Sequence, residues 1–260
     1  GALLLLLAEN DSWWTEPPPP PEDLAKLVAQ RETLNLREAM RLLGWGRVGD
    51  YFAHRWSDPT YVAGLTLLNA HWVSPDRAFE LACGIGHYLR AMSLVGVPTI
   101  GADVVFAKLW VARNWVAPQA ELVCFDANYA WPIEVKTDLA FCHDAFYFLT
   151  NKKAVTKQIR EVAPVIAFAH IHNANHPSLS AAHGMTFDEV NEMFPDATFH
   201  FERALVSGAK TALLWRVHGH HANGRRIRLI GSSVFTPGEE DTLLDRAALT
   251  AQSQAAHIEY

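Results

Sequence analysis

From Arg77 onward, short apolar runs alternate with amphipathic segments of helix length, and this alternation constrains the fold more than any other feature. Strands separated by helices usually return in the same direction, so the pattern is typical of a parallel sheet covered by helices. Residues 198–204 and 210–217 differ, because the link between them is too short for a parallel return and therefore predicts an antiparallel hairpin.

We therefore predict a doubly wound, Rossmann-like α/β fold with a mostly parallel seven-stranded sheet, an antiparallel C-terminal hairpin and an N-terminal helical cap. Thr186 and Glu189 have the spacing of a capping box and mark the start of one helix. The expected strands are residues 78–82, 98–102, 121–125, 138–142, 165–170, 198–204 and 210–217, and the expected helices are 85–95, 104–115, 152–162 and 186–194.

The residues outside this pattern divide into three further parts. Residues 1–21 are a tail that ends in consecutive prolines, which favour an extended spacer. Residues 22–75 are expected to form the helical cap, with one helix over 22–43 that ends at Gly44 and Gly46 and a second over 61–72. The sheet domain then covers 76–217. The extension, 218–260, has no clear pattern beyond an expected loop at 218–221, a strand at 226–235 and a helix at 239–256.

The composition excludes several classes of protein. Half of the 260 residues are hydrophobic and 19% are charged, which suits a globular core and not a disordered or collagen-like chain. The net charge of -6 disfavours nucleic acid as a partner. The run of leucines near the N-terminus is too short to span a bilayer and lacks the flanks of a signal peptide, so we expect a cytoplasmic protein without a membrane partner. Cys83, Cys124 and Cys142 are expected to be buried free thiols.

A glycine turn follows the first expected strand of the sheet. Gly84 and Gly86 lie between the apolar run that ends near Leu81 and the helix that follows. Glycine allows the backbone to approach a ligand closely, and the helix N-terminus adds amide donors. Such a turn alone is weak support for a nucleotide-type ligand.

Acidic residues occur at matching places on three strands. Glu80 lies near the end of the first strand, Asp103 follows the second, and Asp126 follows the third, each 23 residues after the one before. A carboxylate after the second strand is placed to accept both hydroxyls of a ribose. Either aspartate could instead cap a helix or form a turn.

At these residues the chain resembles the class I S-adenosylmethionine-dependent methyltransferases. Their first motif is an acid and an apolar residue followed by Gly-x-Gly-x-Gly, and residues 80–86 match it except at Ala82, where the first glycine is expected. Alanine should cost little there unless the position requires a positive φ. The resemblance covers residues 77–217 and implies S-adenosyl-L-methionine as the cofactor.

The resemblance also implies roles for the strand ends. Asp103 would bind the ribose, Asp126 would contact the adenine amino group, and the glycine turn would flank the methionine part. The cofactor-binding residues expected on this basis are Glu80, Ala82, Cys83, Gly84, Gly86, Asp103, Val104, Asp126, Ala127 and His143. A nicotinamide dehydrogenase fits less well, because the third glycine of its fingerprint would fall on Leu89 and Asp126 would have no role.

Histidines follow the fourth and fifth strands, where the acceptor of an open α/β sheet would lie. His143 could be a general base or an adenosyl contact, or it could cap the next helix. His170 and His172 fall on one face of a strand and could remove a proton, bind the acceptor, form structural hydrogen bonds or hold a metal. We expect His143, His170 and His172 as catalytic candidates and no metal, because no further ligand has a companion spacing.

The cap contributes a short polar and aromatic stretch that contains Tyr51, His54, Arg55 and Trp56. The resemblance implies that such residues close over the cofactor, although ordinary helix packing would also explain them.

These observations predict an enzyme that transfers a methyl group from S-adenosylmethionine to an oxygen or nitrogen of a small-molecule acceptor. The alternative is a non-catalytic domain of the same fold with a structural or regulatory role in a larger protein. The sequence leaves open whether the chain belongs to such a longer protein or forms a homo-oligomer.

Overall fold

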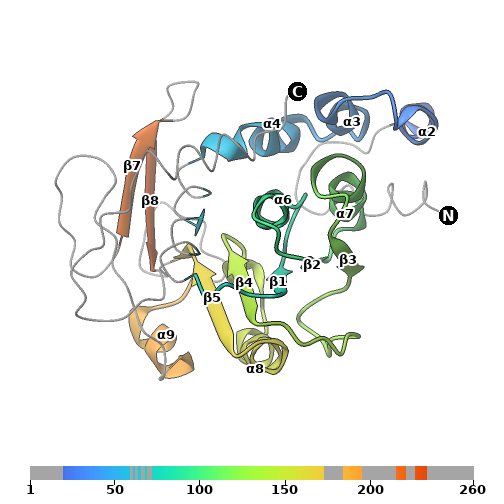
Figure 1. Cartoon of the computed structure of the whole chain (residues 1–260). Helices are drawn as coiled ribbons and strands as arrows, with labels where there is room; N and C mark the ends of the chain where they lie inside the picture. Colours follow the sequence, from blue (N-terminus) through green and yellow to red (C-terminus); the bar gives the residue numbers. More distant parts are fainter. Residues whose placement is uncertain are drawn as a thin grey trace.

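A computed structural model describes residues 20–58, 61, 64–65, 68, 72–172, 184–194, 215–220 and 226–232 of the chain. Its centre is a parallel sheet of five strands in the order β3-β2-β1-β4-β5 (Figure 1). The strands are β1 (Ala78–Leu81), β2 (Thr99–Asp103), β3 (Glu121–Cys124), β4 (Leu139–His143) and β5 (Val165–Ala169).

The three central strands are buried along their whole length, whereas β3 at one edge is partly exposed. This burial explains why the central strands are nearly continuous apolar runs. Helices α6 (His87–Leu94) and α7 (Phe106–Val111) cover one face, and α7 continues as a π-helical turn, η2 (Ala112–Val116). The opposite face packs on α8 (Lys152–Val162) and α9 (Phe187–Met193). The capping box of Thr186 and Glu189 is present as predicted.

The cap has more helices than the sequence predicted. Instead of one helix over 22–43, the chain forms α2 (Pro21–Gln30) and α3 (Leu36–Leu42), because the Asn35 side chain caps a new helix and pairs with Glu38 in a capping box. Gly46, expected to end a helix, begins α4 (Gly46–His54), which continues into the 3₁₀ turn η1 (Arg55–Ser57).

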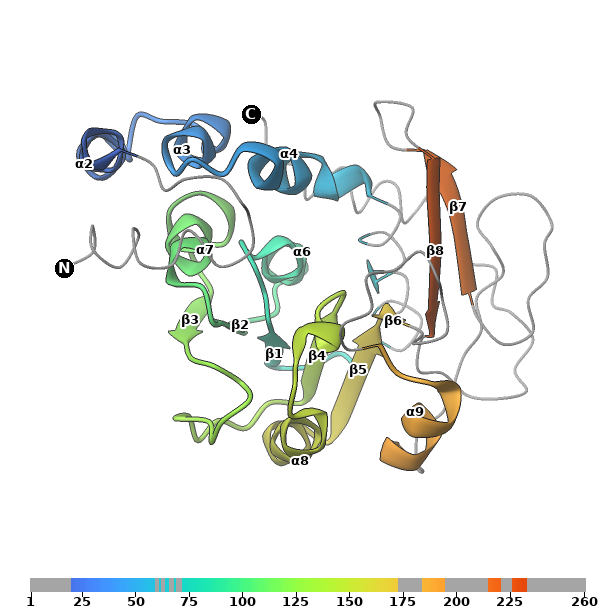
Figure 2. The same cartoon turned by 180° about the vertical axis from the view of Figure 1, so that it is seen from behind.

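The cap helices lie in a row outside α6 and α7, as both views of the fold show (Figures 1 and 2). Leu24, Leu27 and Leu43 share one apolar core with Tyr88 of α6 and Val111 of α7. The indole N–H of Trp115 donates to the carbonyl oxygen of Leu34 at 2.8 Å. The α2–α3 part of the cap is therefore fixed to the sheet domain mainly by apolar packing.

The predicted seven-stranded sheet is wrong for the part of the chain that the structure describes, where the main sheet has five strands, all parallel. The strand expected at 198–204 lies outside the described residues. Residues 215–217 belong to β7 (Trp215–His220), which pairs antiparallel with β8 (Arg226–Ser232) in a separate sheet that also contains β6 (Ile171–His172). Strand β7 thus continues through 218–220, where a loop was expected, because its partner comes from the extension.

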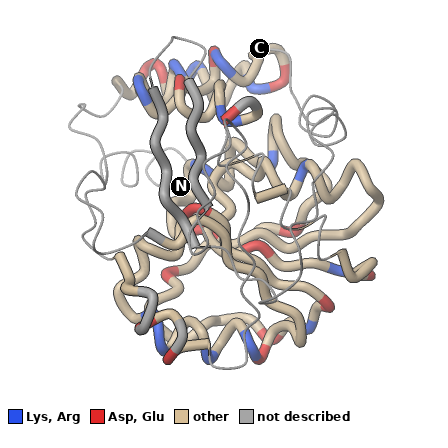
Figure 3. Tube along the Cα trace, turned by 90° about the vertical axis from the view of Figure 1, so that its left-hand side faces the viewer, with Lys and Arg blue, Asp and Glu red and all other residues tan. Residues whose placement is uncertain are grey.

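Charged residues lie mainly on the outer helices. In the view of Figure 3, Lys and Arg are interspersed with Asp and Glu along the described helices at both ends of the molecule.

The three cysteines differ in burial. Cys83 and Cys142 are buried as predicted, whereas Cys124, on the partly exposed edge strand, is exposed. Among the described residues, no helix combines the length and apolar character needed to cross a membrane.

The close packing of α6 on β2 makes Gly101 sensitive to substitution. A Cβ at Gly101 would lie 2.9 Å from the Cys83 Sγ and 3.1 Å from the Leu122 Cδ2, and closer still to Leu89. We expect Gly101→Ala to lower the free energy of unfolding by about 1–3 kcal/mol, the usual effect of overpacking. Urea denaturation checks this, with Gly49→Ala as the control. Gly49 lies inside α4 with its nearest contact at 3.4 Å, so that variant should be neutral or up to about 1 kcal/mol more stable.

Candidate functional site

The chain order of the sheet reverses between β1 and β4, because β2 and β3 extend to one side and β4 and β5 to the other. In open α/β sheets, ligands bind outside the carboxyl ends of the strands at this point of reversal. The turn after β1 and the turn after β4 therefore define the candidate site.

The turn after β1 consists of alternating left-handed residues. Ala82, Gly84 and Gly86 have φ values of 57°, 57° and 87°, and α6 begins directly after Gly86. The exception considered for residue 82 therefore applies: this position has a positive φ, which strains a residue that has a Cβ.

Asp103, at the end of β2, holds this turn in place. Its carboxylate accepts the backbone N–H of Gly84 at 2.8 Å through Oδ2 and the N–H of Val105 at 2.8 Å through Oδ1. The side chain is buried at 6% exposure. Each carboxylate oxygen has a further lone pair, so Asp103 can still accept hydrogen bonds from a ligand.

Glu80 lies on the neighbouring strand with its carboxyl group buried at 3% exposure. The backbone N–H of Leu89 donates to this group, but Oε2 has no hydrogen-bond partner within the described part of the chain. Burial raises the pKa of Glu80 well above its ordinary value, although the charge of Arg55 opposes the rise. An unsatisfied buried oxygen at this place is consistent with a ligand group that completes its hydrogen bonding.

The other expected cofactor residues have mixed surroundings. Cys83 is buried in the turn, Ala127 is buried after β3, and Val104 is half exposed. Asp126 accepts both the backbone N–H and the side-chain amide of Asn128 through Oδ1, each at 2.9 Å. Asp126 therefore forms the turn that was considered as its alternative role, and nothing in this geometry tests an adenine contact.

His143 ends β4 and is buried at 4% exposure beside the edge of Tyr88 and the ring of Phe141. Neither ring nitrogen has a hydrogen-bond partner among the residues described. Burial, and then the charges of His170 and Arg55, lower the pKa of His143 well below its ordinary value. The imidazole is thus neutral near pH 7, and one of its ring nitrogens can accept a hydrogen bond.

His170 follows β5 and is also buried, with a left-handed φ of 62°. The backbone of His172 lies in β6, opposite Gly231, so the two histidines do not share one regular strand as the sequence suggested. No group of three or more His, Cys, Asp or Glu that could hold a metal ion occurs in the described ranges.

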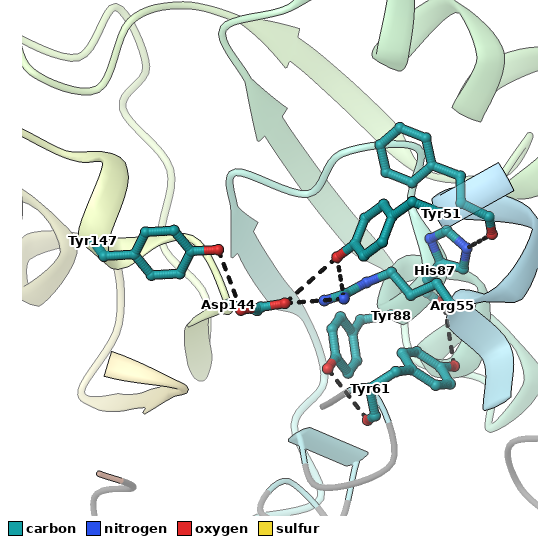
Figure 4. Close-up of polar contacts among 8 residues, drawn as sticks. Tyr51, Arg55, Tyr61, His87, Tyr88, Asp144 and Tyr147 are labelled. Carbon is teal, nitrogen blue, oxygen red and sulfur yellow. Dashed lines mark hydrogen bonds and ion pairs between the residues drawn. The ribbon is translucent and has the colours of Figure 1, made fainter. Parts of the chain in front are cut away.

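A hydrogen-bonded network joins the cap to the loop after β4 (Figure 4). The Arg55 guanidinium forms an ion pair with Asp144 at 3.0 Å and donates to the Tyr51 hydroxyl. Tyr51 also donates to Asp144 Oδ2 at 3.4 Å, and Tyr147 donates to Oδ1 at 3.3 Å. Burial would lower the pKa of Arg55, but Tyr51 and Asp144 more than compensate and raise it.

The cap also covers the glycine turn. The Phe52 ring lies 3.6 Å from where a Cβ of Gly84 would be, and the Phe52 carbonyl lies 3.1 Å from His87 Nε2. Trp56 contacts the His87 ring with centroids 4.3 Å apart. Burial lowers the pKa of His87 to about 3, so this imidazole is neutral and donates from Nε2 to the carbonyl.

Sequence reasoning missed the roles of His87, Tyr88 and Asp144. His54, one of the expected cap residues, is exposed on α4, whereas Arg55 and Trp56 face inward. Asp144 directly follows His143 at the end of β4. The signal used for Asp103, an acidic residue after a strand, could therefore have identified Asp144 as well. Its partner Arg55 lies 89 residues earlier, and no local pattern could indicate that pairing.

The strain at Ala82 leads to a stability prediction. Ala82→Gly should raise the free energy of unfolding by up to about 1 kcal/mol, because relief of the left-handed strain exceeds the added backbone entropy of the unfolded chain. Chemical denaturation measures the change. The matched control is Ala78→Gly, in the extended part of β1, which removes the same methyl group and should destabilise the protein. Equal losses in both variants would contradict the strain at residue 82.

Comparison of the sequence with protein-family models gives no match, and no curated protein matches it either. Comparison of the structure with solved structures does find similar folds. TehB from Haemophilus influenzae aligns with a TM-score of 0.52 at 20% identity, over 71% of this chain and 65% of that chain. A chain from the complex between the Haloferax volcanii Trm112 methyltransferase activator and the putative methyltransferase aligns with a TM-score of 0.50 at 16% identity, over 74% of this chain and 97% of that one.

A TehB-like SAM-dependent methyltransferase from Corynebacterium glutamicum gives a TM-score of 0.49 at 17% identity, over 72% of this chain and 96% of that chain. At these identities the likeness concerns the fold. The chain spans about two thirds of the length of the TehB chain. The expected α/β fold is confirmed at this level, because the chain shares its fold with TehB and with the chain from the methyltransferase complex.

Proposed function

We propose that this protein is an S-adenosylmethionine-dependent methyltransferase that acts on an oxygen or nitrogen of a small-molecule acceptor. The observation that carries the proposal is the left-handed turn after β1, tied by its Gly84 N–H to the carboxylate of Asp103 at the point where the sheet reverses. A strained turn of this kind persists where the surrounding structure holds it, and such positions cluster at ligand sites. The predicted domain bounds and cytoplasmic location belong to the same proposal.

The residues at the site fit such a cofactor. Gly84 and Gly86 supply the left-handed backbone of the turn, and the N-terminus of α6 adds amide donors. We assign Asp103 to the ribose hydroxyls. Val104 exposes apolar surface beside it, and the unsatisfied Oε2 of Glu80 can accept a hydrogen bond from a polar group of the ligand. We assign Ala82, Cys83, Asp126 and Ala127 to the surroundings of the same ligand.

The cofactor supplies a methyl group on a sulfonium that is already activated for displacement. The protein then has to align the acceptor and, where the acceptor atom carries a proton, to accept that proton. We assign this second role to His143, because its unsatisfied ring nitrogens lie at the carboxyl end of β4 and its imidazole is neutral, although its lowered pKa makes it a weaker base than an exposed histidine. We place His170 beside it as an acceptor contact, and His172 remains a candidate on its position after β5 alone.

Binding of S-adenosylhomocysteine tests the proposal directly. At 100 times its dissociation constant the product analogue should stabilise the protein by about 2.7 kcal/mol, seen as a higher melting temperature. Asp103→Ala should weaken this binding roughly ten- to a hundredfold, because it removes hydrogen bonds to a charged group.

Calorimetry on folded protein measures the affinity in both forms. Glu121→Gln, an exposed carboxylate at the start of β3, is the matched control and should bind as the wild type does. Wild-type protein without measurable affinity would favour the non-catalytic domain. Unchanged affinity in Asp103→Ala would remove this residue from the site.

The role of His143 is tested by its effect on turnover. With an acceptor identified from a panel of phenols, amines and carboxylic acids, His143→Gln should lower kcat by about 10²–10⁴-fold and leave the affinity for S-adenosylhomocysteine nearly unchanged. Because the pKa of His143 is lowered, its neutral form persists on acidification, so activity should be retained as the pH falls through 6.5. An equal loss of cofactor affinity, or full activity in the variant, would exclude it as the base.

A further inference from the structure

The ion pair between Arg55 and Asp144 joins two parts of the chain that are far apart in sequence. Arg55 belongs to η1 at the end of the cap, and Asp144 directly follows β4. The Asp144 backbone is fixed to the sheet, since its N–H donates to the carbonyl of Ala169 at 3.0 Å and its φ is left-handed at 55°. The pair therefore connects the cap to a rigid point on the sheet.

Both ends of the cap share one apolar core, and the α4–η1 end differs by its additional polar contacts with the sheet domain. The α2–α3 end packs through buried leucines on α7 and is anchored by Trp115. The α4–η1 end adds polar contacts, which are the ion pair, the Tyr51 and Tyr147 hydroxyls and the hydrogen bond of His87 with the Phe52 carbonyl. A single substitution in the ion pair removes polar contacts of this end and leaves the residues of the apolar core in place.

The ion pair is largely buried, and only the tyrosine beside it is exposed. The side chains of Arg55 and Asp144 are 8% and 13% exposed, and Tyr51 beside them is 39% exposed. The same end of the cap places Phe52 directly over Gly84. A ligand at the glycine turn is thus enclosed when this end is in place and can pass when it moves away.

We propose that the Arg55–Asp144 pair is a latch that holds the α4–η1 end of the cap closed over the carboxyl ends of β1 and β4, and that opening of this latch admits and releases the ligand. The closure follows from the contacts alone. The identity of the ligand rests on the proposed function, so the test has one arm without ligand and one arm with it.

The first arm measures hydrogen–deuterium exchange of the ligand-free protein. In Asp144→Asn, amide exchange over residues 46–57 should become about tenfold faster, while residues 21–42 should be unchanged, because only the latched end opens locally. Arg77→Gln is the control, since it breaks a more exposed ion pair, with Glu121 at 2.7 Å, at the opposite end of the sheet. Unchanged exchange over 46–57, or equal acceleration over 21–42, would overturn the latch.

The second arm measures association and dissociation of S-adenosylhomocysteine by stopped-flow tryptophan fluorescence. In Asp144→Asn and in Arg55→Lys, both rate constants should rise by about tenfold while Kd changes by less than about threefold, as expected when a barrier falls and the bound state is unchanged. If only the dissociation rate constant rose, the pair would contact the ligand directly. If neither rate constant changed, the pair would have a purely structural role. Either result overturns the proposal that the pair gates the site. If the wild type binds nothing, the proposed function fails, and the exchange arm still decides whether the cap is latched.

Discussion

The carboxylate of Asp103 restrains the part of the backbone on which the site depends. It accepts one N–H from the turn after β1 and one from the turn after β2, and so ties together the turns that follow two paired strands. Buried amides in irregular turns need such a partner, because no neighbouring strand supplies one. The turn after β1, held by Asp103, determines where α6 begins, and α6 carries His87 and Tyr88 against the cap. One charged group thus connects the sheet, the turn and the cover of the site.

Unfavourable features concentrate at the same strand ends. Ala82, Asp144 and His170 follow β1, β4 and β5, three neighbouring strands, and all have left-handed backbones, each at a cost of about 1–3 kcal/mol. Glu80 and His143 add buried polar atoms without partners in the described part of the chain. The rest of the sheet is regular and apolar, so these costs have a local cause. Residues selected only for stability would not gather strain and unsatisfied groups at one point of the fold.

The sequence predicted the five parallel strands and the helices between them because each is a local pattern of apolar residues long enough to be distinct. It also placed the glycine turn and Asp103 correctly at adjoining strand ends. The prediction failed where a glycine could mark either end of a helix, as at Gly46, which begins α4 instead of ending a helix. It could not reveal the pairing of Arg55 with Asp144 or the neutral state of His87, because both depend on contacts between distant segments.

The separation of Arg55 from Asp144 has a consequence for the synthesis of the chain. The cap segment is made 89 residues before the aspartate that holds it. At about 5–20 residues per second, ribosomes need roughly 5–20 s to add that length. During this interval β4 is unfinished, so Phe52 and Trp56, both buried in the finished protein, belong to a cap whose ion-pair partner on the sheet does not yet exist. The nascent cap can therefore present an aromatic surface to chaperones before the domain behind it is complete.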